Sequence, residues 1–389
     1  MLRMVALGLQ GLLLVYLAYE LVVSLWGWPH PTKAPRSQRA QRFRVVIPAH
    51  NEGAVIRHIL TDLSRQEYDR ALVRVVVIAD RSDDDTAAVA ERLAEVAERR
   101  VGSGGKGNAI DWYLDEAPLD ADEALVIFDA DTRVPPESLA RIADELATGP
   151  QACQLYLDVD NPDGSLVATA SALSYWAGNR MVQLARHRIG WSADLGGTGM
   201  AFAADGVTAI GRFGGGLTED QGALARLVAS GGRVGWIHDV RLRDEKPQDV
   251  AVAVHQRARW VAGKRAVARA ALRPLLTAAW AKRSWAPVDV AIRLVQPGRS
   301  FLALIAALLA AVAAVTGAAA LLPWWLWALV AAVVVIAPVA FLVRDGVPGR
   351  YVVRYPVVAL LAILWLPIRV MSRIRRRGWR RTPRRAEQA

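Results

Sequence analysis

Cysteine is almost absent from this sequence, because Cys153 is the only one among 389 residues. A single cysteine excludes an intrachain disulfide, and with it the small folds that several disulfides hold together. The sequence also lacks CxxC and HExxH motifs and has only six scattered histidines, which argues against a structural zinc site. With 53% hydrophobic residues the chain is too apolar for disorder over most of its length, so we expect a folded core.

Acidic residues are missing from two short segments that account for the net charge of +11. Residues 33–44 contain five Lys and Arg, and residues 369–385 contain nine Arg. Each segment lies beside a long apolar run, whereas a nucleic-acid-binding protein more often spreads basic residues over a folded face. The pattern favours membrane topology signals and lipid headgroup contacts, and it predicts a lipid bilayer and no nucleic acid as partner.

Residues 4–26 form an apolar run with one acidic residue, Glu20, and this run is long enough to cross a bilayer as a helix. A secretory signal peptide is the alternative, but the run is too long for one and no small-residue cleavage site follows it. We therefore predict a transmembrane helix over 1–28 and a basic linker over 29–42. By the positive-inside rule, this linker places the following domain in the cytoplasm.

Three further apolar segments lie in the last third of the chain. Residues 273–296 mix Trp, Lys and Arg with apolar side chains, which predicts an interfacial amphipathic segment, with a core helix of the soluble domain as the alternative. Residues 300–343 predict two joined spans. The run at 351–371 spans the membrane, re-enters it or lies in the interface; three full spans would put the arginine tail outside, against the positive-inside rule. For a multi-pass protein of the cell membrane we expect these boundaries: motif and interfacial helices at 251–297, transmembrane segments at 298–371 and a basic tail at 372–389.

Residues 43–250 have the composition of a soluble α/β domain. Helical patterns alternate with three short runs rich in β-branched residues, at 43–47, 73–78 and 124–128. One helical pattern predicts a helix over 86–100, with Ser82 or Asp83 as its N-cap. Alternating strands and helices predict a mostly parallel sheet, whose ligands bind outside the carboxyl ends of the strands.

Polar side chains follow each of these three strands. Asn51 and Glu52 follow the first, Asp80 follows the second, and Asp129 and Asp131 follow the third. Because the carboxyl ends of parallel strands meet at one edge of a sheet, we expect these side chains to converge. An Asp-x-Asp pair suits a Mg²⁺ or Mn²⁺ ion that also binds a substrate diphosphate. Such an ion stabilises the diphosphate as a leaving group.

Residues 102–107, GSGGKG, match the GxGxxG pattern of dinucleotide-binding loops. The context contradicts that reading, because charged residues precede the loop where a buried strand should stand. A Walker A loop is excluded as well, since Gly107 stands where Ser or Thr should follow the lysine. We expect a flexible loop that offers Lys106 to a nucleotide diphosphate, with a plain linker as the alternative.

Two more clusters, TED at 218–220 and QRARW at 256–260, complete a set. Together with Asp80 and Asp129-x-Asp131 they resemble, in order and spacing, the D, D, D, Q(Q/R)xRW signature of membrane-bound family-2 glycosyltransferases. That family includes cellulose, chitin, hyaluronan and poly-N-acetylglucosamine synthases and ceramide glucosyltransferase. The resemblance covers about residues 43–265. It implies an α/β, GT-A type nucleotide-sugar-binding domain joined to transmembrane and interfacial helices.

The resemblance also implies roles for individual residues. Asp80 looks like the aspartate that contacts the uracil of a UDP-sugar, with Glu52 beside it. Asp129 and Asp131 look like the pair that meets the diphosphate and its Mg²⁺ or Mn²⁺, and Asp220 looks like the catalytic base.

The QRARW motif resembles the interfacial-helix motif of the family. Gln256 and Arg259 would then lie at the nucleotide-sugar, with Arg259 on the diphosphate, and Trp260 would also pack at the acceptor. On the acceptor side the resemblance adds Glu219 and, in a turn at 196–200 that matches the family only loosely, two more residues, Gly197 and Thr198.

These roles imply an inverting transfer of a hexosyl or N-acetylhexosaminyl group from a UDP-sugar to an acceptor hydroxyl. Asp220 would take the hydroxyl proton, while Arg259, Lys106 and the metal stabilise charge on the departing UDP. The complete QRARW motif and the two joined spans favour repeated extension of a β-linked polysaccharide, which we expect. The single N-terminal span favours the alternative, one transfer to a ceramide-like or polyprenyl-linked lipid. A membrane protein without catalysis would leave these motifs unexplained.

Overall fold

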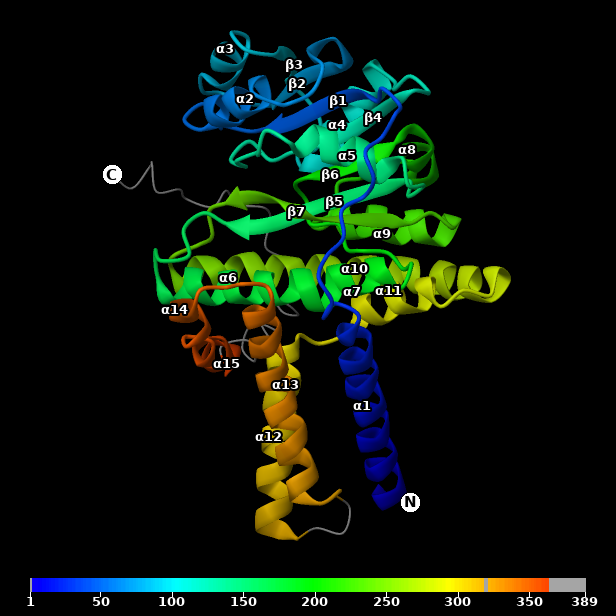
Figure 1. Ribbon diagram of the computed structural model, residues 1–389, viewed down its shortest axis with the longest axis vertical. Coiled ribbons are helices and arrows are strands. Elements are labelled where there is room, and N and C mark those ends of the chain that lie inside the picture. Colours follow the sequence, from blue (N-terminus) through cyan, green and yellow to red (C-terminus); the bar gives the residue numbers. More distant parts are fainter. Residues whose placement is uncertain (1, 318–320, 364–389) are drawn as a thin grey trace.

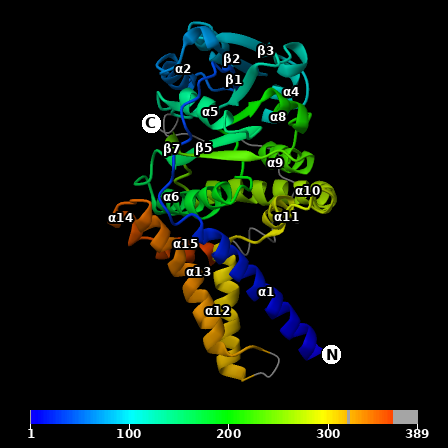
Figure 2. The same ribbon diagram turned by 45° about the vertical axis from the view of Figure 1, so that its right-hand side comes forward.

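The computed structural model of this chain describes residues 2–317 and 321–363. Figure 1 shows three levels along the long axis: an α/β domain, helices that cross beneath it, and helices that point away from it. The last group contains α1 (Leu2–Leu25), α12 (Arg299–Thr316) and α13 (Trp324–Arg344). Figure 2 shows the same three levels from another side, with α6, α10 and α11 between the sheet and the protruding helices.

A seven-stranded sheet lies at the centre of the α/β domain, in the order β3-β2-β1-β4-β6-β5-β7. Four of its strand pairs are parallel, and β6 runs antiparallel to both of its neighbours. The expected α/β class with a mostly parallel sheet is therefore confirmed. The strands are β1 (Arg42–Ala49), β2 (Val73–Asp80), β3 (Glu95–Arg99), β4 (Glu123–Ile127), β5 (Ala152–Val159), β6 (Met200–Ala203) and β7 (Val234–Asp244).

Helices cover both faces of this sheet because its central strands are apolar on both sides. In β1, Val45 and Ile47 belong to one buried core and Val46 belongs to the other, as the alternation of side chains along a strand requires. The first core is completed by α2 (Ile56–Ser64), α3 (Thr86–Ala90) and α5 (Ser138–Leu146). The second core includes the helices α4 (Lys106–Glu116), α6 (Leu166–Gly178), α8 (Ala204–Ile210), α9 (Glu219–Ser230), α10 (Val250–Lys282) and α11 (Ala286–Val295), together with parts of the more C-terminal helices.

The prediction of a helix over residues 86–100 is wrong. Only Thr86–Ala90 is helical, its N-cap position is Asp85, and Glu95–Arg99 forms the edge strand β3. This segment is rich in Ala, Glu and Arg, which favour helices locally. Parallel pairing with β2 satisfies its backbone groups instead, so tertiary contact outweighs local propensity.

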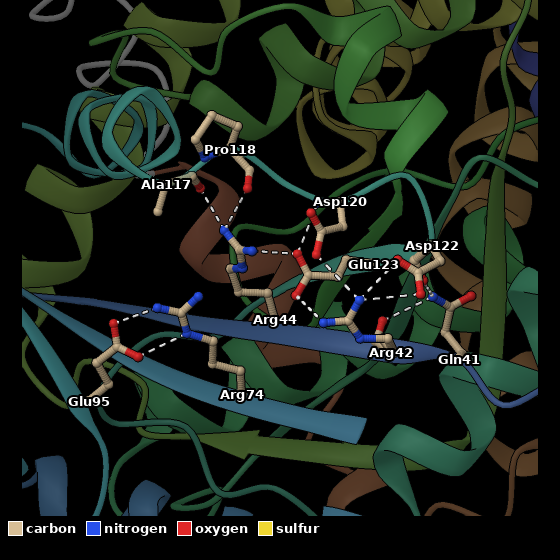
Figure 3. A network of polar contacts seen from close by, with 10 residues as sticks. All are labelled: Gln41, Arg42, Arg44, Arg74, Glu95, Ala117, Pro118, Asp120, Asp122 and Glu123. Carbon is tan, nitrogen blue, oxygen red and sulfur yellow. Dashed lines mark hydrogen bonds and ion pairs between the residues drawn. The ribbon is translucent and has the colours of Figure 1, made fainter. Parts of the chain in front are cut away.

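Part of the basic run at 33–44 lies inside the fold. Arg44 on β1 and Glu123 on β4 are both 4% exposed and form an ion pair at the amino ends of their strands (Figure 3). Arg44 Nη1 also donates to the carbonyl oxygens of Ala117 (2.5 Å) and Pro118 (3.0 Å). Arg44 is therefore a structural residue, and the prediction that the whole run contacts lipid headgroups fails at this position.

The segment predicted to lie at the membrane interface, 273–296, is two helices. It contains the end of α10 and all of α11, separated at Arg283, which adopts the left-handed conformation (φ 49°). Trp280 and Trp285 are strongly exposed, as an interfacial segment requires, whereas Val290 belongs to the buried core. The core-helix alternative therefore holds for part of the segment, and its place at a membrane interface stays a prediction.

Two described helices, Arg3–Leu25 and Trp324–Arg344, are long and apolar enough to cross a membrane, and Phe301–Thr316 is a shorter apolar helix. Of the run at 351–371, only the first part is described. It holds the end of α14 (Gly349–Val352) and α15 (Pro356–Ile363), and the arginine tail lies outside the described residues. The remaining short helical elements are η1 (Arg70–Leu72), η2 (Asn179–Leu184) and α7 (Ala185–Arg188).

Candidate active site

A cleft of about 1300 Å³ opens at the carboxyl ends of β1, β2 and β4 and extends along α10. Asn51, whose Oδ1 accepts from the Asp83 N–H at 3.0 Å, does not line its wall, but every other site residue predicted from the sequence does. These are Glu52, Asp80, Lys106, Asp129, Asp131, Gly197, Thr198, Glu219, Asp220, Gln256, Arg259 and Trp260. The rule that ligands of parallel sheets bind beyond the strand ends therefore located the cleft correctly.

At one end of the cleft, two arginines hold Asp80. Its Oδ1 accepts from Arg99 Nη1 at 2.6 Å and from Arg81 Nε at 3.3 Å, and Asp80 and Arg99 are both buried. Glu52 lies beside it in the next loop, where its backbone N–H donates to Thr86 Oγ1 at 2.8 Å. Arg99 comes from β3, the strand that sequence reasoning missed, so the partner that orients Asp80 was missed with it.

Lys106 lies at the first turn of α4 and contacts the Asp-x-Asp loop. Its ammonium donates to Asp129 Oδ1 at 2.5 Å and to the Gly197 carbonyl at 2.8 Å. Burial disfavours the ammonium, but the carboxylates of Asp129 and Glu219 outweigh it and raise the pKa of Lys106. The 102–107 loop is thus part of the site and no plain linker, and its lysine stays charged.

Glycine is required in this loop by close packing. A Cβ atom on Gly107 would lie 2.0 Å from the Gly214 carbonyl oxygen, and Gly105 has a φ of 116°.

Thr198 accepts a hydrogen bond from the Asp129 N–H at 3.0 Å through its Oγ1. Gly197 and Thr198 therefore lie directly against Lys106 and Asp129, and their predicted acceptor-side role stays a prediction.

The donor atoms around the Asp-x-Asp pair fit a divalent ion that the substrate helps to hold. Among the described residues, no group of three or more His, Cys, Asp or Glu side chains forms a metal cage. Asp129 and Asp131 supply hard carboxylate oxygens, which Mg²⁺ and Mn²⁺ accept together with phosphate oxygens. Burial, offset in part by Lys246 and reinforced by the charges of Asp131 and Asp129, raises the pKa of nearby Asp244 to about 6. This concentration of negative charge favours a cation.

Asp220 lies in the first turn of α9, where its Oδ1 accepts from the Gln221 N–H at 2.8 Å. Burial and then the adjacent Glu219 carboxylate raise the pKa of Asp220 to about 7. A carboxylate with this pKa can accept a proton near neutral pH, which is the property that a general base needs.

The QRARW motif lies on α10 beside this turn. A Cβ atom on Gly263 would lie 2.7 Å from the Thr218 side chain, so glycine there lets α10 approach the start of α9. Gln256, Trp260 and Lys264 follow one another at intervals of four residues and therefore share one face of the helix. All three line the cleft.

Asp194 and Lys264 are among the cleft residues that were not predicted from the sequence. Lys264 could have been found by extending the helical period of the QRARW motif by one turn beyond Trp260. Asp194 follows no motif, and its place in the cleft depends on contacts with distant segments.

A mostly parallel sheet with an Asp-x-Asp loop and further acids at its carboxyl edge defines a GT-A-like fold. The family model described as "Glycosyltransferase like family 2" matches residues 40–263. The chain belongs to this family.

Two curated relatives agree with this family. A β-monoglucosyldiacylglycerol synthase of Synechocystis sp. is 27% identical over 236 residues, which are 56% of this chain and 47% of that protein. An uncharacterized glycosyltransferase of Escherichia coli is 30% identical over 131 residues, which are 32% of this chain and 30% of that protein. The chain thus spans about half the length, or less, of these relatives.

A mannosyltransferase from Pyrobaculum calidifontis, solved in complex with GDP-Man and Mn²⁺, has a TM-score of 0.59 and 21% sequence identity. The likeness covers 92% of this chain and 99% of that one. It shows that the fold, including helices outside the family match, is shared.

Proposed function

We propose that this chain is an inverting, metal-dependent membrane glycosyltransferase that moves a sugar from a UDP-sugar to an acceptor hydroxyl. The observation that carries the proposal is the convergence of Asp80, Asp129, Asp131 and Asp220 with the QRARW face of α10 in one cleft. These groups come from four separate segments, and each has the chemistry that one part of the reaction needs.

The donor occupies the strand-end part of the cleft. Asp80, held by Arg99, and Glu52 contact the base, and Asp129 and Asp131 would hold the Mg²⁺ or Mn²⁺ ion. When bound, that ion supplies charge stabilisation to the diphosphate leaving group. Lys106 and Arg259 add two cations of the protein itself to the diphosphate.

The chemical step is one displacement at the anomeric carbon. The acceptor oxygen forms a bond to this carbon as the bond to the diphosphate oxygen breaks, and the hydroxyl proton moves to Asp220. Attack opposite the leaving group inverts the centre, so an α-linked donor yields a β-linked product. The nucleoside diphosphate leaves with the bonding electron pair.

A lipid is the acceptor that we favour. Names of several relatives, β-monoglucosyldiacylglycerol synthases, describe a lipid product with one β-linked sugar. In this chain, the cleft extends along α10, which lies between the sheet and the apolar helices. We propose a cell-membrane enzyme of several spans, with its α/β domain on the cytoplasmic side. Extension of a β-linked polysaccharide is the second candidate, favoured by the complete QRARW motif.

The proposal is tested by incubating the purified full chain, in lipid nanodiscs with Mn²⁺, with a panel of UDP- and GDP-sugars. We expect nucleotide diphosphate release with a UDP-sugar, loss of release with EDTA, and a labelled lipid that carries one sugar. A series of products of increasing length would instead show extension of a polysaccharide and contradict the single transfer to a lipid. If no donor of either base released nucleotide, the glycosyltransferase mechanism proposed for this cleft would be refuted.

A further inference from the structure

A row of buried charges connects the first apolar helix, α1, to the wall of the cleft. Glu20 Oε1 on α1 pairs with Arg186 Nη2 at 2.9 Å, and Arg186 Nε pairs with Asp289 Oδ1 at 3.0 Å. Arg293 Nε then pairs with Asp289 Oδ2 at 2.8 Å, and Arg293 Nη1 pairs with Asp194 Oδ1. Arg186, Asp289 and Arg293 are at most 1% exposed. The last member, Asp194, lines the cleft.

Two hydrogen bonds, one from this row and one to a neighbouring glutamine, hold the segment around Asp194. Arg293 Nη2 donates to the Ser192 carbonyl at 2.9 Å, and the Asp194 N–H donates to Gln183 Oε1 at 2.7 Å. Buried ion pairs contribute little net stability, because desolvation of the charges offsets their attraction. Their consequence here is geometric: Asp194 has one carboxylate oxygen bound to Arg293 and a fixed orientation. Its other oxygen, Oδ2, has no hydrogen-bond partner in residues 2–317 and 321–363.

Lys264 lines the same cleft from α10. Within the described part of the chain its ammonium makes no hydrogen bond and no ion pair. Burial lowers the pKa of Lys264, and the charges of Asp194 and Asp220 oppose that effect. The ammonium lines one cleft with both carboxylates without being bound by either, and it lies on the helix face that carries Gln256 and Trp260.

We propose that Asp194 and Lys264 bind the acceptor beside Asp220, with Arg293 as the positioning residue that orients Asp194. This inference rests on the proposed transfer to an acceptor hydroxyl. The free oxygen of Asp194 accepts a hydrogen bond from one acceptor hydroxyl, and Lys264 donates to a neighbouring oxygen.

The acceptor class follows from the balance of charge. Arg293 already pairs with Asp289 and Asp194, so among the described residues Lys264 is the cation left to meet an acceptor. A phosphate in this cleft would meet the carboxylates of Asp194 and Asp220 with only that one unpaired ammonium of the described chain to offset them. Hydroxyl groups, which donate and accept hydrogen bonds, suit a carboxylate and an ammonium together. The subsite therefore fits an uncharged, hydroxyl-bearing headgroup, such as a glycerol or sugar hydroxyl. The row of ion pairs holds this subsite at a constant position relative to α1, and hence to a lipid whose chains stay in the bilayer.

The test compares Asp194→Asn and Lys264→Met with the unaltered full chain in nanodiscs that contain diacylglycerol. Loss of one hydrogen bond to a charged group should raise the acceptor KM by about 10-fold to 100-fold. The donor KM should stay within about twofold. Arg269→Met, which removes an exposed cation from the same helix, is the matched control and should change neither KM.

Arg293 is tested separately, because it acts through Asp194. Arg293→Met should raise the acceptor KM, and Arg293→Lys, which keeps a cation there, should restore part of the loss. A role in folding alone would instead lower donor binding and acceptor binding together, and that result would overturn the assignment.

Three further outcomes would decide against parts of the inference. A parental acceptor KM in both Asp194→Asn and Lys264→Met would overturn it while leaving the glycosyltransferase proposal intact. Preference for a phosphate-bearing lipid such as phosphatidylglycerol, abolished by Lys264→Met, would overturn the uncharged acceptor. Absence of nucleotide release by the unaltered chain with any donor would refute the proposed function itself.

Discussion

The pH dependence of turnover is the sharpest consequence of the site. Burial and the neighbouring Glu219 raise the pKa of Asp220 to about 7, and only the deprotonated carboxylate can take the acceptor proton. With that pKa, about half of the molecules carry the active form at pH 7 and about one tenth at pH 6. The acceptor kcat/KM should therefore rise about tenfold per unit up to pH 6 and level off above pH 8.

Two variants separate this explanation from others. Asp220→Asn should lower turnover by roughly 10²-fold to 10⁴-fold and flatten the acidic limb, while binding of UDP and Mn²⁺ persists. Glu219→Gln removes the neighbouring charge, so the apparent pKa should fall by roughly one unit, which corresponds to about 1.4 kcal/mol of repulsion. Glu116→Gln, at an exposed carboxylate at the end of α4, is the matched control and should leave the profile unchanged.

The assay is release of UDP at a series of pH values with saturating donor and limiting acceptor. An acidic limb that persists in Asp220→Asn would show that another group takes the proton. Loss of UDP affinity in that variant would instead identify Asp220 as a ligand or a structural residue, and the general-base reasoning would be wrong.

Three further predictions concern the donor side and the fold. Asp131→Ala should abolish Mn²⁺-dependent UDP binding, measured by calorimetry, because a principal ligand is removed; near-parental Mn²⁺-dependent turnover would contradict the metal assignment. Lys106→Met should weaken UDP binding by about 10-fold to 100-fold, and an unchanged affinity would remove Lys106 from the diphosphate site. Arg44→Met should lower the free energy of unfolding by about 3–5 kcal/mol, because it leaves Glu123 buried without its partner. Arg74→Met, which breaks an exposed pair in the same region (Figure 3), should cost about 1 kcal/mol or less in denaturant unfolding; equal losses would refute the burial argument.

The sequence alone determined the central sheet strands, the acids that follow them and the family motifs. These features are local, because a β-branched run such as that at 73–78 predicts a buried strand without reference to the rest of the chain. The residue after such a run, Asp80, then lies at a strand end by geometry alone. Convergence of these acids in one cleft followed from the same rule.

Only the tertiary structure decided which polar groups meet. The segment 95–99 is a strand because β2 lies beside it, although its composition favours a helix, and Arg99 reaches Asp80 only for that reason. Arg44 belongs to a run that looks like a membrane signal, yet Glu123 on the neighbouring strand holds it inside the fold.

The polar contacts proposed for the acceptor side were even harder to predict from the sequence. Asp194 gains its orientation from Arg293, and the row of charges ends at Glu20, far away in the sequence. No local pattern encodes these pairings, because an ion pair requires two side chains to lie within a few ångströms of each other and shielded from water. Helical period could place Lys264 on the motif face of α10, but only the folded chain shows that it lines one cleft with Asp194 and Asp220.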